Sequence, residues 1–553
     1  MNTPKNKKSL RGQGRSALSV SVWQLLLMAG LLTAAVSPPI LSMAQAGEKS
    51  SSKKSTKKTT AEPAQTDLSY PADQANPGNK NDPWWSPNDG REFPREQIAL
   101  NPNGALTTLN VAGPTDTRGH AFFTPLGKNG RACITCHQPS DNMSLSVNTI
   151  KDRWAALAEK DPLFAAADGA NCPHLPMAQA SSHSLLLDRG LFRIALPWPP
   201  QSASGEKIKP EFSIEVVRDP TGCNQSAVYG LKGKEKSISV YRRPRPVANL
   251  KYIMAVGYAF DPKSGLPLQR DKETGEYVSE ALMADSRALT LKAQAVDAIK
   301  VHLQRHGNPS PAQVKQIVEF ESQIYSAQSH DVWGRSLADA GAKGGPEAMV
   351  HAKPGILQTA VKPTWQEFQS WKDATKQKSD YTDEQQKFRE SVARGAALFT
   401  AKNFLIKGTA GINSMGFGDP LRNSCAMCHN MVGSGIDIAP GRIDLGTTNE
   451  PFAKHSPELP LFKLTCNDHA KPHPFLGKVV YTQDPGYAMT TGRCEDIGKI
   501  STQAMRGLSG RAPYFANGSA ATLREIVEIY DRRYNIKYTE QEIQDLVNLM
   551  QAL

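Results

Sequence analysis

Two pentapeptides, Cys133-Ile134-Thr135-Cys136-His137 and Cys425-Ala426-Met427-Cys428-His429, carry the strongest signal in this chain. Both have the pattern Cys-x-x-Cys-His, which is typical of a c-type haem attachment site. There the two thiols bond to the haem and the histidine binds the iron from the proximal side. A structural zinc site or a redox dithiol would also use paired cysteines, but neither explains the histidine after both pairs. The sequence predicts two covalently attached haem c groups, each held by two cysteines and a proximal histidine (Cys133, Cys136, His137; Cys425, Cys428, His429).

The N-terminus has the features of a secretory signal. Five basic residues precede an apolar run from Ala17 to about Val36, and Ala44-Gln45-Ala46 offers small residues for cleavage. The Pro38-Pro39 pair argues against an uncleaved anchor, and no other stretch is long and apolar enough to span a bilayer. We therefore expect a signal peptide over residues 1–46, no stable membrane span after its removal, and a bacterial protein that is periplasmic or secreted.

Residues 47–92 form a predicted linker rich in lysine, serine, proline and asparagine. Cleavage after Ala46 lowers the formal net charge from +12 to +7, and five lysines between Lys49 and Lys58 supply much of the remainder. Such a composition cannot build a core, so we expect a disordered basic tether. An exported chain does not meet nucleic acid, so we expect no nucleic-acid partner, although docking to an anionic partner or surface stays open.

The cysteine count agrees with export. Eight cysteines less the four of the motifs leave Cys172, Cys223, Cys466 and Cys494. An oxidising compartment lets these form two disulfides. We expect Cys172–Cys223 and Cys466–Cys494, because each pair lies within one region relative to the motifs; four inert thiols are the alternative.

Helix signals dominate the chain outside one region. We expect a helix over about 281–306, ended by Gly307 and Pro309, and another from Ser310-Pro311 with an apolar stripe that reaches Tyr325. Capping-box patterns at Thr382, Thr522 and Thr539 predict three more helices, the first reaching about Phe399. Apolar alternation predicts short strands or extended loops over 207–220 and 237–242.

The predicted fold is mainly α, with two cytochrome c-like haem domains. The first spans 93–380 and carries a long, partly β or irregular insert at about 138–242. The second spans 381–553, and the helix from Thr382 precedes its motif as the N-terminal helix of a cytochrome c domain would.

From the first motif onward, the chain resembles the bacterial di-haem cytochrome c peroxidases and their MauG-type relatives. The resemblance rests on Arg242-Arg243-Pro244, Phe404-Leu405-Ile406-Lys407-Gly408, Asp484-Pro485-Gly486 and the segment from Arg511-Ala512-Pro513-Tyr514-Phe515 to Leu523. It implies that hydrogen peroxide reacts at the haem of His137, while the haem of His429 relays electrons from a small redox protein or an organic donor.

The resemblance also suggests further site residues. The distal ligand of the second iron, Met in the peroxidases and Tyr in MauG-type proteins, falls at Tyr530, with Met489 and Met505 as rivals. The Trp that bridges the haems in a WDGR-like segment is best matched by Tyr258, which would relay oxidising equivalents. The calcium-ligating Asn falls at Arg243, which argues against bound Ca²⁺ because a guanidinium supplies no oxygen ligand.

The distal side of the first haem is less defined. No histidine occurs between His137 and His174, so a switchable histidine ligand soon after the motif is absent. Met143, His174 and His183 are candidates for distal ligation or acid–base work, with packing or structural roles as the alternative. The His302/His306 pair has metal-like spacing at a helix end, where solvated imidazole is the simpler interpretation.

Three functions remain open at this point. The first is an exported peroxidase or MauG-like oxidase, which we favour. The second is a plain electron-transfer cytochrome with both irons six-coordinate. The third is a dioxygen-activating enzyme resembling rubber oxygenase, a larger di-haem relative with long inserts.

Overall fold

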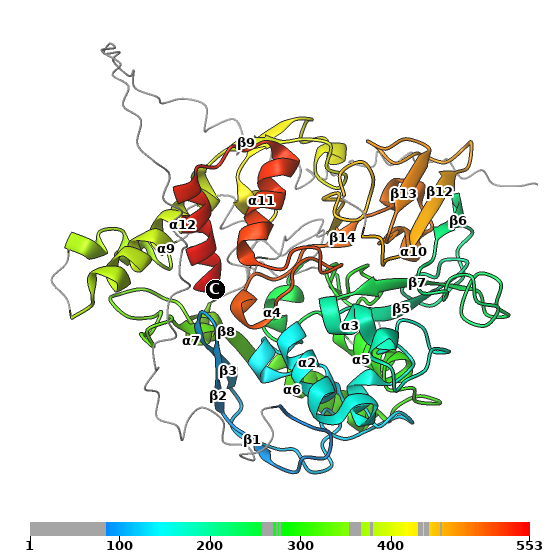
Figure 1. Ribbon diagram of the computed structural model, residues 1–553, viewed down its shortest axis with the longest axis horizontal. Coiled ribbons are helices and arrows are strands. Elements are labelled where there is room, and N and C mark those ends of the chain that lie inside the picture. The colour runs from blue at the N-terminus through cyan, green and yellow to red at the C-terminus, as the bar shows by residue number, and fades with distance from the viewer. Residues whose placement is uncertain are drawn as a thin grey trace, which may run out of the picture. The chain divides into compact units, whose positions relative to one another are not determined.

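Figure 1 shows the computed structural model, which describes residues 84–256, 269–271, 275, 278–352, 366–376, 380–429, 435, 442–453 and 456–553. All of them fall within one unit of the chain, residues 61–553. The predicted signal peptide, most of the predicted linker and Tyr258 lie outside the described residues.

The helices near the second motif begin where their capping residues predict. The Thr382 and Thr539 side chains each accept a hydrogen bond from the backbone N–H three residues on. The side chains of Gln385 and Glu542 accept from the backbone N–H groups of Thr382 and Thr539, which completes the two capping boxes. Thr522 caps its helix in the same way, but the carboxylate of Glu525 accepts instead from the backbone N–H of Ala521 at 2.6 Å. These helices are α9 (Asp383–Ala401), α12 (Glu540–Gln551) and α11 (Leu523–Tyr534).

The other described α-helices are no longer than α11 and α12, and all but α10 lie before α9. They are α2 (Val147–Leu157), α3 (Ser184–Arg189), α4 (Leu250–Ile253), α5 (Leu291–Val301), α6 (Pro311–Ser322), α7 (Pro346–His351) and α10 (Ala488–Thr491). No helix among the described residues is long and apolar enough to cross a membrane.

The helix predicted over 281–306 is wrong at both ends. It begins ten residues later, where the Thr290 side chain caps α5, and it ends at Val301. Met283 and Ser286 have φ angles of 63° and 52°, in the left-handed region that a helix does not use. The stripe predicted to reach Tyr325 is also too long, because Ile324 and Tyr325 begin a strand, β8 (Ile324–His330).

The strands form small antiparallel sheets. The predicted strands at 207–220 and 237–242 are confirmed as β6 (Phe212–Arg218) and β7 (Ser237–Arg242), and β7 pairs with β5 (Phe192–Pro197). Strands also occur well outside the predicted insert, which corrects the expectation that β structure is confined to it. They include β2 (Glu96–Asn101) and β3 (Gly104–Asn110), which form a three-stranded sheet with β8 in the order β2-β3-β8.

The remaining strands are mostly two to four residues long. They are β1 (Glu92–Phe93), β4 (Thr115–Asp116), β9 (Phe404–Ile406), β10 (Leu421–Asn423), β11 (Arg442–Ile443), β12 (Leu461–Cys466), β13 (Val479–Thr482) and β14 (Ile500–Ser501). One sheet joins distant parts of the chain, since β6 from the insert pairs with β12, and β12 with β13 (Figure 1).

The end of the predicted linker is ordered. Trp85 is buried in a cluster that includes Phe93 and Ile134, its indole N–H donates to Gln97, and its backbone N–H donates to Gln138. The tryptophan supplies the apolar area that the lysine-rich part lacks, so residues 84–92 belong to the fold. A second large cluster fills the space between α9, α11 and α12, with Val392, Leu523 and Leu549 among its members.

Both predicted disulfides are confirmed. Cys172–Cys223 lies within the insert and joins Cα atoms 5.4 Å apart. Cys466–Cys494 ties the end of β12 to the turn after α10, with Cα atoms 5.8 Å apart. The four motif cysteines are free of disulfides.

Candidate functional site: two cavities behind the Cys-x-x-Cys-His motifs

The two motifs fold into the same turn. Each begins as a 3-10 turn that follows an extended residue. The second cysteine donates its backbone N–H to the carbonyl of the first at 3.2 Å in both, and the histidine donates to that carbonyl at 3.1 Å in the first motif and 3.0 Å in the second. The five residues therefore fix this geometry locally, whatever surrounds them.

The two imidazoles are also oriented alike. Nδ1 of His137 lies 2.9 Å from the carbonyl oxygen of Met143, and Nδ1 of His429 lies 2.9 Å from that of Gly435, six residues on in each case. This bond places the proton on Nδ1 and leaves Nε2 as the free lone pair. Burial lowers the pKa of His137 to about 4 and also lowers the pKa of His429, so both rings are neutral and able to bind a metal.

Each motif opens onto a large cavity. The first cavity, lined by Cys133, Cys136 and His137, has an empty volume of about 1270 Å³. The second, lined by Cys425, Cys428 and His429, has about 1500 Å³. Each cavity brings both cysteines and the histidine of one motif to a single lining, as a covalently attached haem requires.

The thiols fit haem attachment better than the alternative uses of paired cysteines. Burial raises the pKa of Cys136 and of Cys425 to about 11, whereas a redox dithiol needs a lowered thiol pKa. No three His, Cys, Asp or Glu side chains converge as candidate metal ligands in the described part of the chain.

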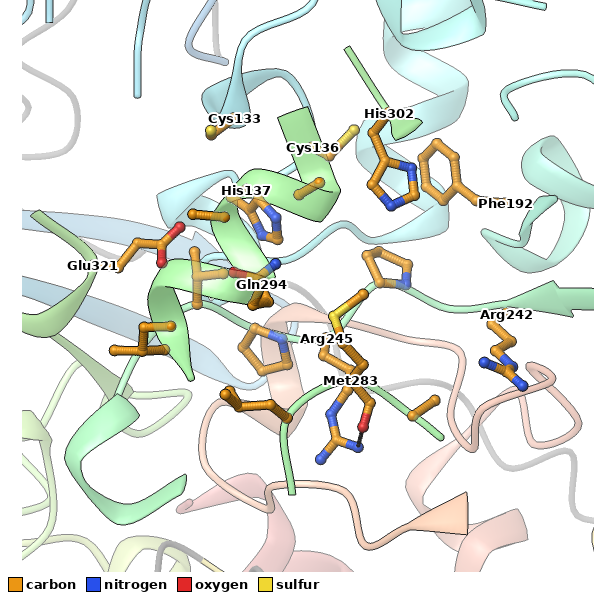
Figure 2. A pocket seen from close by; sticks show the side chains of 18 of the residues that line it. Cys133, Cys136, His137, Phe192, Arg242, Arg245, Met283, Gln294, His302 and Glu321 are labelled. Atoms are coloured by element: carbon orange, nitrogen blue, oxygen red, sulfur yellow. Dashed lines mark hydrogen bonds between the residues drawn. The ribbon is translucent and has the colours of Figure 1, made fainter. Parts of the chain in front are cut away.

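Polar side chains enter the first cavity from α5 and α6 (Figure 2). Gln294 lies on α5, and Glu321 lies on α6. Glu321 is 3% exposed, and its Oε2 has no hydrogen-bond partner. Burial raises its pKa to about 8, so the side chain is a neutral carboxylic acid at pH 7.

A second polar group lies on the Cys136 side of the first cavity. Nδ1 of His302 is 2.5 Å from Asp168, which also forms a buried ion pair with Arg131. Burial alone would raise the pKa of Asp168, but Arg131 and His302 outweigh it and lower the pKa. The His302 ring lies near Cys136 and Phe192 in Figure 2 and borders the cavity, with 26% of its side chain exposed to solvent.

Other candidates around the first motif have structural roles. Met143 is fully buried in the core and offers His137 its carbonyl oxygen. His183 is buried with both ring nitrogens against backbone carbonyls, and His174 stacks on Tyr229. None of these three side chains is among the residues that line the described cavity.

Tyrosines dominate the open side of the second cavity. The hydroxyl of Tyr530 lies 3.2 Å from Nε2 of His429, and burial raises its pKa well above the usual range. Tyr534 stacks beside Tyr530, and Tyr538 places its hydroxyl 3.8 Å from the sulfur of Cys425. No carboxylate is among the residues that line this cavity.

The rival methionines differ in position. Met505 lines the second cavity, whereas Met489 is buried in the core beside the β6–β12–β13 sheet. Ligation by Tyr530 therefore stays a prediction. Its hydroxyl lies close to Nε2 of His429, whereas Met489 lies in the core and away from the cavity.

The segment between the cavities contains Arg243 and Pro244, which line both. Tyr258, predicted to lie there, is outside the described residues. Ala284-Asp285-Ser286-Arg287 keeps the Asp and Arg of a WDGR-like segment at the same spacing and contributes Ala284 and Arg287 to the first cavity. An alanine stands at its aromatic position.

Sequence reasoning missed Glu321, Gln294 and Arg245 in the first cavity. A signal for Glu321 exists, because it lies four residues after Ile317 and seven after Val314, on the apolar face of α6. A carboxylate on such a face is rarely buried without a purpose or a partner. Gln294 and Arg245 carry no comparable sequence signal.

Comparisons with known proteins give one partial match in sequence. An 82-residue stretch is 37% identical to cytochrome-c peroxidase IdrP1 of Denitromonas iodatirespirans, over 13% of this chain and 22% of that protein. The chain thus spans about a fifth of the length of this curated relative. No family model matches the chain.

A solved MauG-like protein associated with microbial copper homeostasis aligns with a TM-score of 0.24 and 18% identity, over 57% of this chain and 76% of its own. The peroxidase match is the stronger finding, and it comes from a protein with an oxidoreductase activity. Over this 82-residue stretch the chain is similar to a cytochrome-c peroxidase.

Proposed function

We propose that the mature protein is an exported di-haem c-type cytochrome that acts as a peroxidase or MauG-like oxidase. Cys133, Cys136 and His137 would hold one haem c, and Cys425, Cys428 and His429 the other. Hydrogen peroxide is the oxidant at the first haem, and the second relays electrons from a small redox protein or organic donor. Each peroxide takes up two electrons and two protons and leaves as two water molecules.

The observation that carries this proposal is the difference between the two free imidazole nitrogens. Nε2 of His429 faces the Tyr530 hydroxyl at 3.2 Å, whereas Nε2 of His137 has no protein hydrogen-bond partner among the described residues. His429 and Tyr530 would together be placed to hold the second haem, whereas His137 would hold the first haem with room left for a small oxidant.

The first cavity is equipped to handle protons. The haem would supply the redox chemistry when bound. Glu321 holds a proton on its carboxyl group at neutral pH, and Gln294 offers an amide donor from α5. Apolar side chains such as Val247, Leu250 and Ile253 line the same cavity and exclude water around these groups.

The second cavity is equipped to hold one ligand in place. Three phenols on and after α11, those of Tyr530, Tyr534 and Tyr538, line it, and the Tyr534 hydroxyl forms a hydrogen bond with that of Thr409 at 2.8 Å. An electron path to the first cavity runs past Arg243 and Pro244 in this proposal, and Tyr258 is retained as a candidate relay.

Low-temperature EPR and absorption spectra of the as-isolated protein test the proposal. We expect one high-spin and one low-spin ferric haem, with peroxide changing the high-spin signal first. Two low-spin haems, with no peroxide reaction even after partial reduction, would establish an electron carrier instead. Incorporation of two oxygen atoms from labelled dioxygen into a product would establish the oxygenase alternative.

A further inference from the structure

Three backbone carbonyls from distant parts of the chain meet at the guanidinium of Arg243. Its Nη2 donates to the carbonyl of Arg511 at 2.9 Å and to that of Leu145, and Nη1 donates to that of Arg189 at 3.4 Å. Leu145 lies near the first motif, Arg189 ends α3 in the insert, and Arg511 begins the loop before α11. The Arg243 backbone N–H also donates to Ala516 at 2.8 Å.

The fold leaves space for this guanidinium. Gly190 follows α3 with a φ of 63°, and a Cβ there would lie 1.8 Å from Nη1 of Arg243. Any larger residue at 190 would displace the arginine. The glycine therefore meets two needs at once, a left-handed helix end and room for the charged group.

Arg243 differs from its neighbour Arg242 in what it binds. Arg242 forms ion pairs with Asp285 and Asp484. The hydrogen bonds of the Arg243 side chain go to neutral carbonyl oxygens, and its pKa is lowered to about 9, first by burial and then by the charge of Arg511. It still carries its charge at neutral pH, and the hydrogen bonds of this cation go to carbonyl oxygens, with the carboxyl group of Asp141 near enough to favour the charge.

Carbonyl oxygens that converge from separate segments are also ligands for Ca²⁺. Position 243 is where the resemblance places the calcium-ligating Asn of the di-haem peroxidases. A guanidinium that donates to those oxygens uses the lone pairs that a metal ion would need. The residues present therefore do not fit a bound Ca²⁺ at this place.

We propose that the guanidinium of Arg243 is a built-in cation that replaces Ca²⁺ between the two cavities. It holds the loop after the first motif, the end of α3 and the loop before α11 together without a metal ion. This inference rests on haem in both cavities, but not on a reaction with peroxide, so the two proposals fail independently.

Calcium analysis of the mature holoprotein is the first test. We expect less than stoichiometric Ca²⁺ by elemental analysis after gel filtration in buffer with CaCl2. We also expect no change in melting temperature or in the EPR spectra of the two haems when EGTA is added. One tightly bound Ca²⁺ per chain, or a lower melting temperature in EGTA, would overturn the proposal.

Variants test whether the carbonyl cluster is a cation site. Arg243→Asn removes the charge and restores an oxygen ligand, so its melting temperature should fall by several degrees and recover partly in millimolar CaCl2. Arg193→Asn is the control, since the buried Arg193 side chain donates to a single carbonyl, that of Ala167, and to the Ser239 hydroxyl, so its removal leaves no carbonyl cluster. We expect it to be destabilised without recovery in CaCl2.

Recovery confined to Arg243→Asn supports the proposal. Recovery of both variants, or of neither, would contradict it. If Arg243→Asn does not yield folded holoprotein, Arg243→Lys keeps a cation in the cluster and should remain insensitive to both CaCl2 and EGTA. A calcium-dependent melting temperature in Arg243→Lys would likewise contradict the proposal.

Discussion

The two cavities contain the same motif turn and differ in the other residues that line them. Both histidines point Nε2 inward, fixed by a carbonyl six residues on. The other residues that line the first cavity include a neutral carboxylic acid and an amide, and those that line the second include four tyrosines. The motif thus sets the proximal side through local geometry, whereas long-range packing sets the side where reactivity differs.

Removal of the thiols should have the largest effect and should separate the two sites. Cys133→Ala with Cys136→Ala should remove one haem and abolish the peroxide reaction. Cys425→Ala with Cys428→Ala should also remove one haem, but it should abolish the low-spin signal while peroxide still perturbs the first site. Intact mass and EPR measure both outcomes.

Two covalent haems retained in both double variants would refute attachment at these motifs. Loss of the same EPR signal from both would refute the division of roles between them.

Tyr530→Phe tests the wall opposite His429. Removal of the hydroxyl takes away the phenolate that would stabilise Fe(III), so the low-spin spectrum should change and the potential of the second haem should rise. Both haems should stay attached. Tyr534→Phe is the control, because its hydroxyl is bonded to Thr409 and should leave the spectrum unchanged.

Spectroelectrochemistry of the two tyrosine variants measures the effect. An unchanged second haem in Tyr530→Phe would exclude this ligand and favour Met505.

Removal of a disulfide should lower the stability of the protein and leave the EPR spectra of both haem sites unchanged. Loop closure predicts about 4 kcal/mol of unfolding free energy for each, over sequence separations of 51 and 28. Cys172→Ser with Cys223→Ser, and Cys466→Ser with Cys494→Ser, should each lower the melting temperature of the holoprotein. A changed EPR spectrum in either would show that a disulfide shapes a haem site.

Glu321→Gln should change how the stability of the protein depends on pH. Between about pH 4.5 and 8 the folded state keeps a proton that the unfolded state releases, so stability falls as pH rises, by at most about 1.4 kcal/mol per unit. Above about pH 8 the loss levels off. The variant should show a flatter curve of unfolding free energy against pH.

Glu319→Gln on the same helix is the control, because Glu319 is exposed and paired with Lys315. An identical pH dependence in wild type and Glu321→Gln would show that Glu321 does not ionise in this range.

Local features could be predicted from the sequence, and contacts between distant residues could not. The motif turns, the caps at Thr382 and Thr539 and both disulfides follow from short patterns or simple counting. The late start of α5 does not, since Asp285 just before it is held by Arg242, 43 residues earlier. The carbonyl partners of Arg243 lie 54 to 268 residues away.

The same limit applies to the site. Periodicity could place Tyr530 and Glu321 on apolar helix faces, but only tertiary packing brings the first opposite His429 and the second into a cavity. The sequence does not show what the three arginines at 242, 243 and 245 bind. In the fold, Arg242 binds the carboxylate of Asp484, and Arg243 and Arg245 bind backbone carbonyls of Arg511 and Thr502.

The pairing of β6 with β12 limits how the chain can be divided. Residues 212–218 of the insert align with residues 461–466, and β12 in turn pairs with β13. During synthesis β6 therefore stays unpaired until β12, which follows both motifs in the chain, has been made. A gene cut at residue 380 would leave β6 as an unpaired edge, open to aggregation. Each haem-binding half is thus an incomplete module, and coexpressed fragments should reassemble better than either half folds alone.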